Sequence, residues 1–206
     1  GNLNLEYEET KFLEIFGFGN ELRGFSKQSQ PLRIQYYREY DMSIQSVTLK
    51  NYRSFVERTT IELRPLTLLY GYNNSGKSAL LRALPLIADS LGGAQSTPIE
   101  MRSASVRGCH FGDVLSRISG GQTLEIELLL NNPYRLKWTF FDQPKSKSHV
   151  ISRFSMQDAN NHLLLDAQWA AKPEKQHKDV YVVQWYDTPP QEVILLFSGL
   201  LPAWEL

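Results

Sequence analysis

Eight consecutive residues constrain the fold of this chain more than any other feature. Gly71–Ser78 reads GYNNSGKS and matches G-x-x-x-x-G-K-[ST], the pattern of phosphate-binding loops. The apolar run Leu66–Tyr70 before it predicts a buried parallel strand, and the apolar residues from Ala79 to Ile87 have helical spacing. We therefore predict a strand, a glycine-rich turn and a helix, with a nucleoside triphosphate bound at the turn.

Each residue type in this loop has a physical role in holding a triphosphate. Gly71 and Gly76 allow backbone angles that side chains disfavour, so that main-chain N–H groups can surround a phosphate. The helix beginning near Lys77 directs its positive dipole end at the same anion, and Lys77 is the predicted catalytic charge on the outer phosphates. The Ser78 hydroxyl is placed to bind Mg²⁺. With ATP and Mg²⁺ as cofactors, the predicted contacts are Gly71, Tyr72, Asn73, Asn74, Ser75, Gly76, Lys77, Ser78 and Ala79.

The composition is that of an ordinary globular protein. Of 206 residues, 42 % are hydrophobic and 21 % are charged, and the formal net charge is zero, so no overall charge attracts nucleic acid or an anionic membrane. Cys109 is the only cysteine, which excludes an intrachain disulfide, and the four histidines lack metal-ligand spacing. No apolar run has the length of a membrane span and no signal pattern opens the chain. We therefore expect a cytoplasmic protein without membrane partners.

The chain divides into two segments of different character. Residues 1–41 contain a candidate helix, Leu5–Phe16, that is followed by glycines, and we predict an extension that is either a partner arm or a segment packed on the core. Residues 42–206 form the predicted domain, with strands Ser43–Lys50 and Thr59–Leu63 before the loop and a short helix, Phe111–Leu115, after it. Alternating apolar residues then predict an antiparallel meander with strands Thr123–Leu130, Tyr134–Phe141, His149–Met156, His162–Trp169 and Val180–Tyr186.

The residues before the loop resemble a known family. Leu49–Phe55 reads LKNYRSF, and with the strand and loop after it this stretch is similar to the opening of SMC/RecF-type ATPases and of bacterial AAA-family ATPases. The likeness covers Met42–Leu91 well. It implies an α/β (mixed α+β) fold: the ABC-type nucleotide-binding lobe of a P-loop NTPase, with an antiparallel β meander beside it. It also implies that Arg53 and Ser54 lie beside the nucleotide, with an ordinary surface arginine before a turn as the alternative for Arg53. It implies as well that Gln184 contacts Mg²⁺, with an ordinary strand glutamine as the alternative.

The same resemblance implies a function. It points to an ATPase head that forms a homodimer around sandwiched ATP or joins a larger complex, in DNA maintenance, repair or phage defence. Two alternatives are the ATPase part of an ATPase-nuclease of the overcoming-lysogenisation-defect type and a nucleotide-sensing module without turnover.

Hydrolysis by such a head requires a further apolar strand ending in Asp-Glu, and the sequence contains none. The Asp would hold Mg²⁺ and the Glu would activate the attacking water. We therefore expect residues 42–206 to be the N-terminal lobe of a longer ATPase domain. As a complete protein, this sequence would bind ATP and hydrolyse it poorly.

Two further patterns have competing interpretations. Ser119-Gly120-Gly121-Gln122 matches the signature that ABC-type ATPases place against a partner's ATP, but that signature begins a helix, whereas Thr123–Leu130 alternates as a strand. We therefore interpret it as a turn leading into a hairpin. Basic residues near the second meander strand make DNA a candidate partner, with protection of a solvated strand edge as the alternative. These residues are Arg135, Lys137, Lys145, Lys147 and Arg153.

Overall fold

The computed structural model describes seven stretches of the chain, all within the compact unit Met42–Leu206. They are residues 43–73, 75–91, 97–106, 108–131, 134–143, 148–170 and 179–203. The predictions for residues 1–41 lie outside the described residues, as do Asn74, Lys145 and Lys147. Within the described stretches, no helix is long and apolar enough to cross a membrane.

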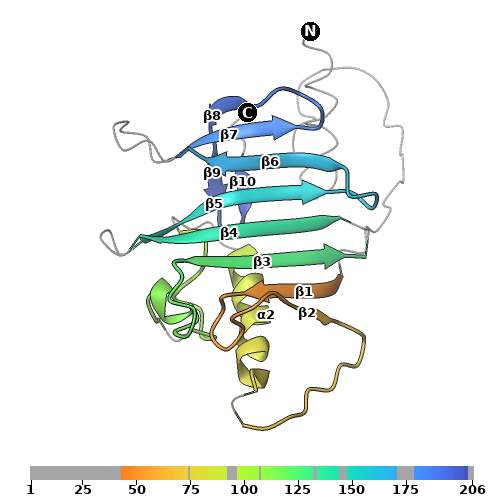
Figure 1. The fold of residues 1–206 in the computed structure, drawn as a ribbon, viewed down its shortest axis with the longest axis vertical. Helices are drawn as coiled ribbons and strands as arrows, with labels where there is room; N and C mark the ends of the chain where they lie inside the picture. Colours follow the sequence, from red (N-terminus) through yellow and green to blue (C-terminus); the bar gives the residue numbers. More distant parts are fainter. Residues whose placement is uncertain are drawn as a thin grey trace, which may run out of the picture. The chain divides into compact units, whose positions relative to one another are not determined.

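An antiparallel sheet of eight strands, ordered β2-β1-β3-β4-β5-β6-β7-β8, forms most of the fold (Figure 1). From β3 to β8 each strand pairs with the next along the chain, which confirms the predicted meander. The strands are β1 Ile44–Lys50, β2 Thr59–Glu62, β3 Thr123–Leu130, β4 Arg135–Gln143, β5 Ser148–Gln157, β6 Leu163–Trp169, β7 Val180–Trp185 and β8 Gln191–Ile194. The other elements are the helix α2 Lys77–Leu91, the 3₁₀ turn η1 Phe111–Asp113, and the strands β9 Leu196–Ser198 and β10 Leu201–Ala203.

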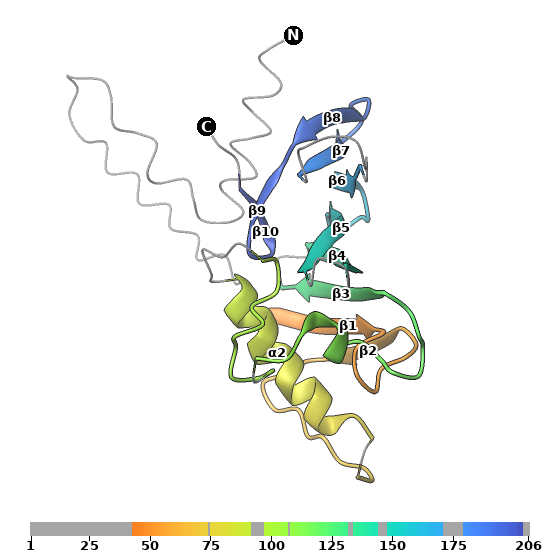
Figure 2. The same ribbon diagram turned by 90° about the vertical axis from the view of Figure 1, so that its left-hand side faces the viewer.

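Helix α2 and the β9–β10 hairpin lie on the same face of the sheet (Figure 2). Leu200, between the two hairpin strands, connects the three parts. Its N–H donates to the carbonyl of Ser90 on α2 at 3.2 Å, and its own carbonyl accepts from Trp138 Nε1 on β4 at 2.7 Å. In the hairpin, the Phe197 ring lies 6.1 Å from the Phe154 ring on β5. The sequence pattern did not predict this hairpin, which closes the core over the middle of the sheet.

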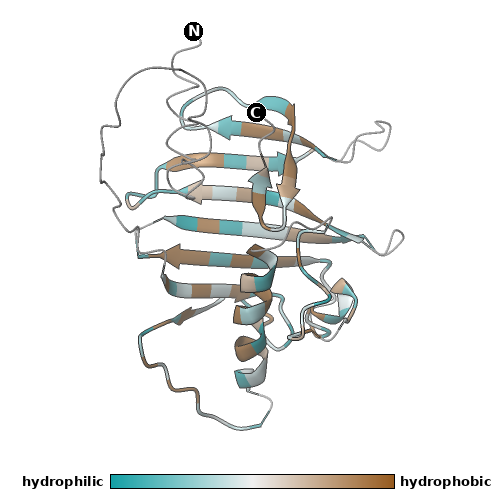
Figure 3. Ribbon diagram, turned by 180° about the vertical axis from the view of Figure 1, so that it is seen from behind, coloured by the Kyte–Doolittle hydropathy of each residue, from teal (hydrophilic) through white to brown (hydrophobic). Residues whose placement is uncertain are grey.

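The two faces of the sheet differ in chemistry because apolar and polar residues alternate along its strands (Figure 3). The covered face carries the buried apolar side chains, and the opposite face carries paired charges such as Glu125 and Lys137. On β3 and β4 the buried residues are Leu124, Ile126, Leu128, Leu136, Trp138 and Phe140.

The predicted parallel strand before the loop is absent from the described structure. Residues 63–73 form a long connection outside the sheet, and Leu66, Leu68 and Tyr70 are 76 %, 76 % and 93 % exposed (Figure 1). A buried parallel strand needs neighbouring strands and cover on both faces, and no described strand pairs with this segment. The expectation of a mixed α/β fold therefore holds in part: the described residues form a mostly antiparallel sheet with α2 as their single α-helix, and the expected parallel strand is not among their strands.

Candidate phosphate-binding site

The glycine-rich loop leads directly into the N-terminus of α2. Residues 71–73 and Ser75 are exposed, α2 begins at Lys77, and Ser78 is exposed on its first turn. This first turn contains no acidic residue. The N–H groups that begin the helix and its positive dipole end therefore meet no local carboxylate that would repel an anion.

The ammonium group of Lys77 lies inside the arc of this loop. Its Nζ donates to the carbonyl oxygens of Gly71 and Tyr72, at 2.6 Å each, and to the hydroxyl of Ser75 at 3.4 Å. None of the ion pairs within the described residues includes Lys77. Its charge is therefore solvated by neutral oxygen atoms, and a phosphate group would supply the stronger, charged acceptor.

Gly71 and Gly76 adopt backbone conformations that other residues disfavour, with φ of 147° and 95°. At Gly76 space is also restricted. A Cβ added there would lie 2.9 Å from Ser54 Oγ and 3.1 Å from Phe55 Cζ. Glycine at this position therefore allows both the turn of the loop and the close approach of a second segment.

That second segment is a tight turn that follows β1. Phe55 N–H donates to the Tyr52 carbonyl at 2.7 Å, and Tyr52 N–H donates back at 3.0 Å. The structure thus places Ser54 against the loop at Gly76. Arg53, in the same turn, has a φ of 48°, and its Nε is buried without a hydrogen-bond partner in the described part of the chain.

Gln184 lies far from this site. It is on β7, opposite Asp166 of β6, and its Nε2 donates to the Tyr186 carbonyl at 3.3 Å. Four strands separate β7 from β1, which corresponds to roughly 24 Å at the usual strand spacing. Helix α2 begins at the β2 end of the sheet (Figure 1). The structure places Gln184 and Ser78 on elements at different ends of the sheet, so the Mg²⁺ contact of Gln184 stays a prediction that this arrangement does not support.

The Ser-Gly-Gly-Gln motif lies in a turn before a strand. Gly120 has a φ of 61°, and β3 begins at Thr123, directly after the motif. The interpretation as a turn leading into a hairpin is therefore confirmed, because no helix begins here to direct its N–H groups at a phosphate. Sequence reasoning missed that Ser119 and Gly121 both contact the side chain of Asn51, the residue before the tight turn.

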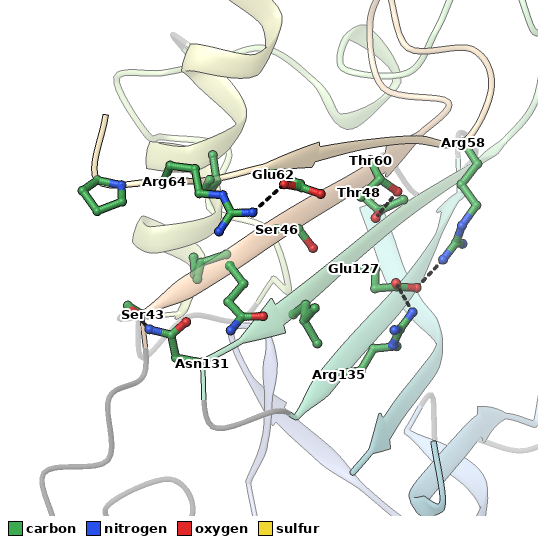
Figure 4. Close-up of a pocket in the computed structure, with 15 residues that line it drawn as sticks. Ser43, Ser46, Thr48, Arg58, Thr60, Glu62, Arg64, Glu127, Asn131 and Arg135 are labelled. Carbon is green, nitrogen blue, oxygen red and sulfur yellow. Dashed lines mark hydrogen bonds and ion pairs between the residues drawn. The ribbon is translucent and has the colours of Figure 1, made fainter. Parts of the chain in front are cut away.

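A groove with a volume of about 770 Å³ lies on the opposite face of the sheet, over β1, β2 and β3 (Figure 4). Its charged residues are paired with one another. Glu127, only 6 % exposed, accepts hydrogen bonds from Arg58 and, at 3.0 Å, from Arg135, while Glu62 and Arg64 pair at 2.9 Å. Each of these charges has a partner, but the three arginines share two carboxylates, so the groove keeps one positive charge in excess.

The basic residues that predicted a DNA surface, where the structure describes them, each have a carboxylate partner. Arg135 pairs with Glu127 at 3.0 Å, Lys137 with Glu125 at 3.1 Å, and Arg153 with Asp166 at 2.8 Å. Burial opposes ionisation of Glu125, but hydrogen bonds from Lys50 and Lys137 hold its pKa below the usual value. The strand-edge alternative is wrong, since β4 and β5 are interior strands of the sheet.

Within the described stretches, no group of three or more His, Cys, Asp or Glu side chains is arranged to hold a metal ion. The hydroxyl of Ser78, on the first turn of α2, is one of the exposed oxygen atoms next to Lys77.

Comparison with known proteins identifies the family of this chain. A search among curated proteins found no match. A family model described as the AAA ATPase domain matches residues 42–186, a range that contains the loop, α2 and the sheet through β7. This range is more than half of the 206 residues. The chain therefore belongs to the AAA ATPase domain family.

Proposed function

We propose that this chain binds ATP with Mg²⁺ at Gly71–Ser78, as the nucleotide-binding part of an ATPase. The observation that carries the proposal is the position of the Lys77 ammonium, which lies within the loop at 2.6 Å from two carbonyl oxygens and next to the N-terminus of α2. A cation and a helix N-terminus at one open turn provide two attractions for the same anion.

In this proposal each group of the loop acts on a different part of the triphosphate. The N–H groups at the start of α2 donate to one phosphate, and Lys77 exchanges its carbonyl partners for oxygen atoms of the outer phosphates. Ser78 suits Mg²⁺, which prefers oxygen ligands, because its hydroxyl is exposed one residue after Lys77. Bound Mg²⁺ supplies charge neutralisation on the phosphates.

A finer proposal is that the chain is the head of an SMC/RecF-type ATPase, in which Arg53 and Ser54 contact the nucleotide. The packing of the Ser54 turn on Gly76 supports it, as does the buried, unpartnered Nε of Arg53 in the same turn. Dimerisation around ATP and a role in DNA maintenance or phage defence rest on the sequence resemblance alone.

Isothermal titration calorimetry with ATP and magnesium tests the proposal. We expect Lys77→Ala to weaken binding by about a hundredfold, because a charge-assisted contact with the phosphates is lost. Lys137→Ala is the matched control, since it removes a lysine from the opposite face of the sheet. Equal affinities of the wild type and Lys77→Ala would contradict the proposal. Steady-state phosphate release then distinguishes an ATPase from a nucleotide sensor.

A further inference from the structure

Asn51 connects the Ser-Gly-Gly-Gln turn to the segment that packs on the phosphate-binding loop. Its side chain is nearly buried, since the residue is only 6 % exposed. The Nδ2 group donates to the carbonyls of Gly121, at 3.2 Å, and of Thr123. The Oδ1 atom accepts from the Ser119 hydroxyl. One amide thus holds Ser119 and Gly121, which precede β3, and Thr123, the first residue of β3.

The backbone of Asn51 holds the tight turn at the same time. Its N–H donates to the Val56 carbonyl at 3.2 Å, and its carbonyl accepts from Ser116 N–H at 3.2 Å. The neighbouring Arg53 N–H donates to the Val114 carbonyl at 2.9 Å. The tight turn and the segment before β3 are therefore fixed to each other through both backbone and side-chain hydrogen bonds.

The far side of the tight turn meets the phosphate-binding loop. Ser54 and Phe55 fill the space beside Gly76 so closely that a Cβ there would lie 2.9 Å and 3.1 Å from their nearest atoms. Lys77, the candidate phosphate ligand, follows directly in the chain. Since packed contacts of this kind transmit displacements instead of absorbing them, a shift of Asn51 reaches the loop.

We propose that Asn51 is a positioning residue that couples residues 119–123 to the phosphate-binding loop, so that the conformation of this segment regulates nucleotide affinity. The inference rests on the proposed function, since it concerns the same site. The outer side of the segment has room to move, because Ile118 is 82 % exposed and a Cβ at Gly120 would meet nothing within 4 Å.

Asparagine suits this position for two physical reasons. Its φ of 58° lies in the left-handed region, which asparagine tolerates better than most residues. Its amide also supplies two donors and one acceptor, as the three contacts require. An ionised aspartate would keep the acceptor for Ser119 but direct an anionic oxygen at two carbonyls. A protonated aspartate would regain one donor, so its effect depends on pH.

The experiment compares ATP affinity, in the presence of magnesium, for four proteins at about pH 8 and about pH 5.5, a range in which a buried carboxyl group changes its protonation. They are the wild type, Asn51→Asp, Asn51→Gly, and the control Asn161→Asp. Glycine removes the amide without straining the positive φ. Asn161 also has a positive φ, of 61°, but is exposed in the turn between β5 and β6.

At both pH values we expect Asn51→Gly to bind about tenfold more weakly than the wild type, and Asn161→Asp to bind equally well. Asn51→Asp should be similarly weak near pH 8 and recover toward the wild-type affinity near pH 5.5. Circular dichroism verifies folding. If Asn51→Gly unfolds the chain, Ser119→Ala replaces it, because this variant removes the hydroxyl that donates to Asn51 Oδ1 and leaves the Asn51 amide in place. It is then expected to weaken binding.

Two results overturn the inference while leaving the proposed function intact. One is wild-type affinity in Asn51→Gly or, where it replaces that variant, Ser119→Ala. The other is a ratio of Asn51→Asp to wild-type affinity that does not change with pH. Failure of the proposed function looks different, because the wild type would then not bind ATP, or would bind it equally well as Lys77→Ala, and the inference would fall with it.

Discussion

The hydroxyl oxygen of Ser54 and the α-carbon of Gly76 are so close that a single methyl group on Gly76 would lie 2.9 Å from that oxygen. The two residues come from different segments, one from the turn after β1 and one from the phosphate-binding loop. The loop therefore depends on its own glycines and also on the turn that packs against it.

This contact predicts the effect of Gly76→Ala. The substitution combines a clash with Ser54 and Phe55 with a φ of 95° that alanine disfavours, so we expect the free energy of unfolding to fall by about 2–4 kcal/mol. Urea unfolding measures it. Gly120→Ala is the control: its φ is 61° but nothing lies within 4 Å of the added Cβ, so backbone strain of about 1 kcal/mol is the whole expected cost. Equal costs at the two sites would show that the Ser54 contact is unimportant.

Glu127 and Glu62 are expected to contribute unequally to the free energy of unfolding. This buried carboxylate bridges Arg58 and Arg135, so Glu127→Gln should lower the free energy of unfolding by about 1–2 kcal/mol, because two guanidinium groups lose their charged acceptor. Glu62→Gln removes a carboxylate that is 73 % exposed and paired with Arg64, and we expect a change of less than about 0.5 kcal/mol. Thermal or urea unfolding of the two variants side by side measures the difference, and similar values would contradict the burial argument.

His149 predicts a loss of stability in mild acid. Burial lowers its pKa from 6.5 to about 4, and the Ile99 N–H donates to Nε2 at 3.0 Å, a hydrogen bond that only the unprotonated nitrogen accepts. The ring is also stacked on Phe111, with 4.5 Å between centroids. Since the folded state disfavours the proton, the histidine's contribution is complete above pH 6.5 and is lost as the pH falls toward 4.

Between about pH 7.5 and pH 5 this loss amounts to about 2 kcal/mol in the free energy of unfolding. Urea titrations at a series of pH values measure it. In His149→Gln, which cannot titrate, the dependence should be shallower by that amount. An unchanged slope in the variant would assign the pH dependence to other groups.

Trp138 predicts how the β9–β10 hairpin is held. Trp138→Phe removes the donor to the buried carbonyl of Leu200 and should cost about 1–2 kcal/mol. Hydrogen exchange at the Leu200 N–H, which donates to Ser90, should become faster. Tyr181→Phe is the control, because it loses one buried hydrogen bond, to Ile151, that does not involve the hairpin. Comparable acceleration in both variants would mean that Trp138 has no special role.

Much of the sheet could be predicted because strand signals are local. Alternation at period two marks β3 to β7 to within one or two residues, and short polar turns between them leave little choice of pairing. The loop and α2 could also be predicted, since the motif and the helical spacing are contiguous in sequence. The charge pairing on the opposite face of the sheet could not be predicted from local patterns. Arg135 and Lys137 look like a basic cluster in the sequence, but their carboxylate partners come from the neighbouring strand β3.

Other structural features depend on contacts with distant segments, and a local sequence pattern does not show which segments these are. The Leu66–Tyr70 run has strand composition, yet it lies exposed because no described strand pairs with it. The β9–β10 hairpin has few residues and weak alternation, and it is held by Trp138 and Ser90 from distant segments. Gln184 was placed at the loop by analogy, whereas strand order puts it at the other end of the sheet.

The sequence by itself determined the phosphate-binding loop, the helix after it and the antiparallel order of the meander, since each depends on residues a few positions apart. Tertiary structure alone decided that the turn after β1 packs on Gly76, that Asn51 binds the segment at the start of β3, and that Arg135, Lys137 and Arg153 pair with carboxylates. These contacts join residues up to about seventy positions apart. Their geometry follows from strand order and close packing, which the chain acquires only when it folds.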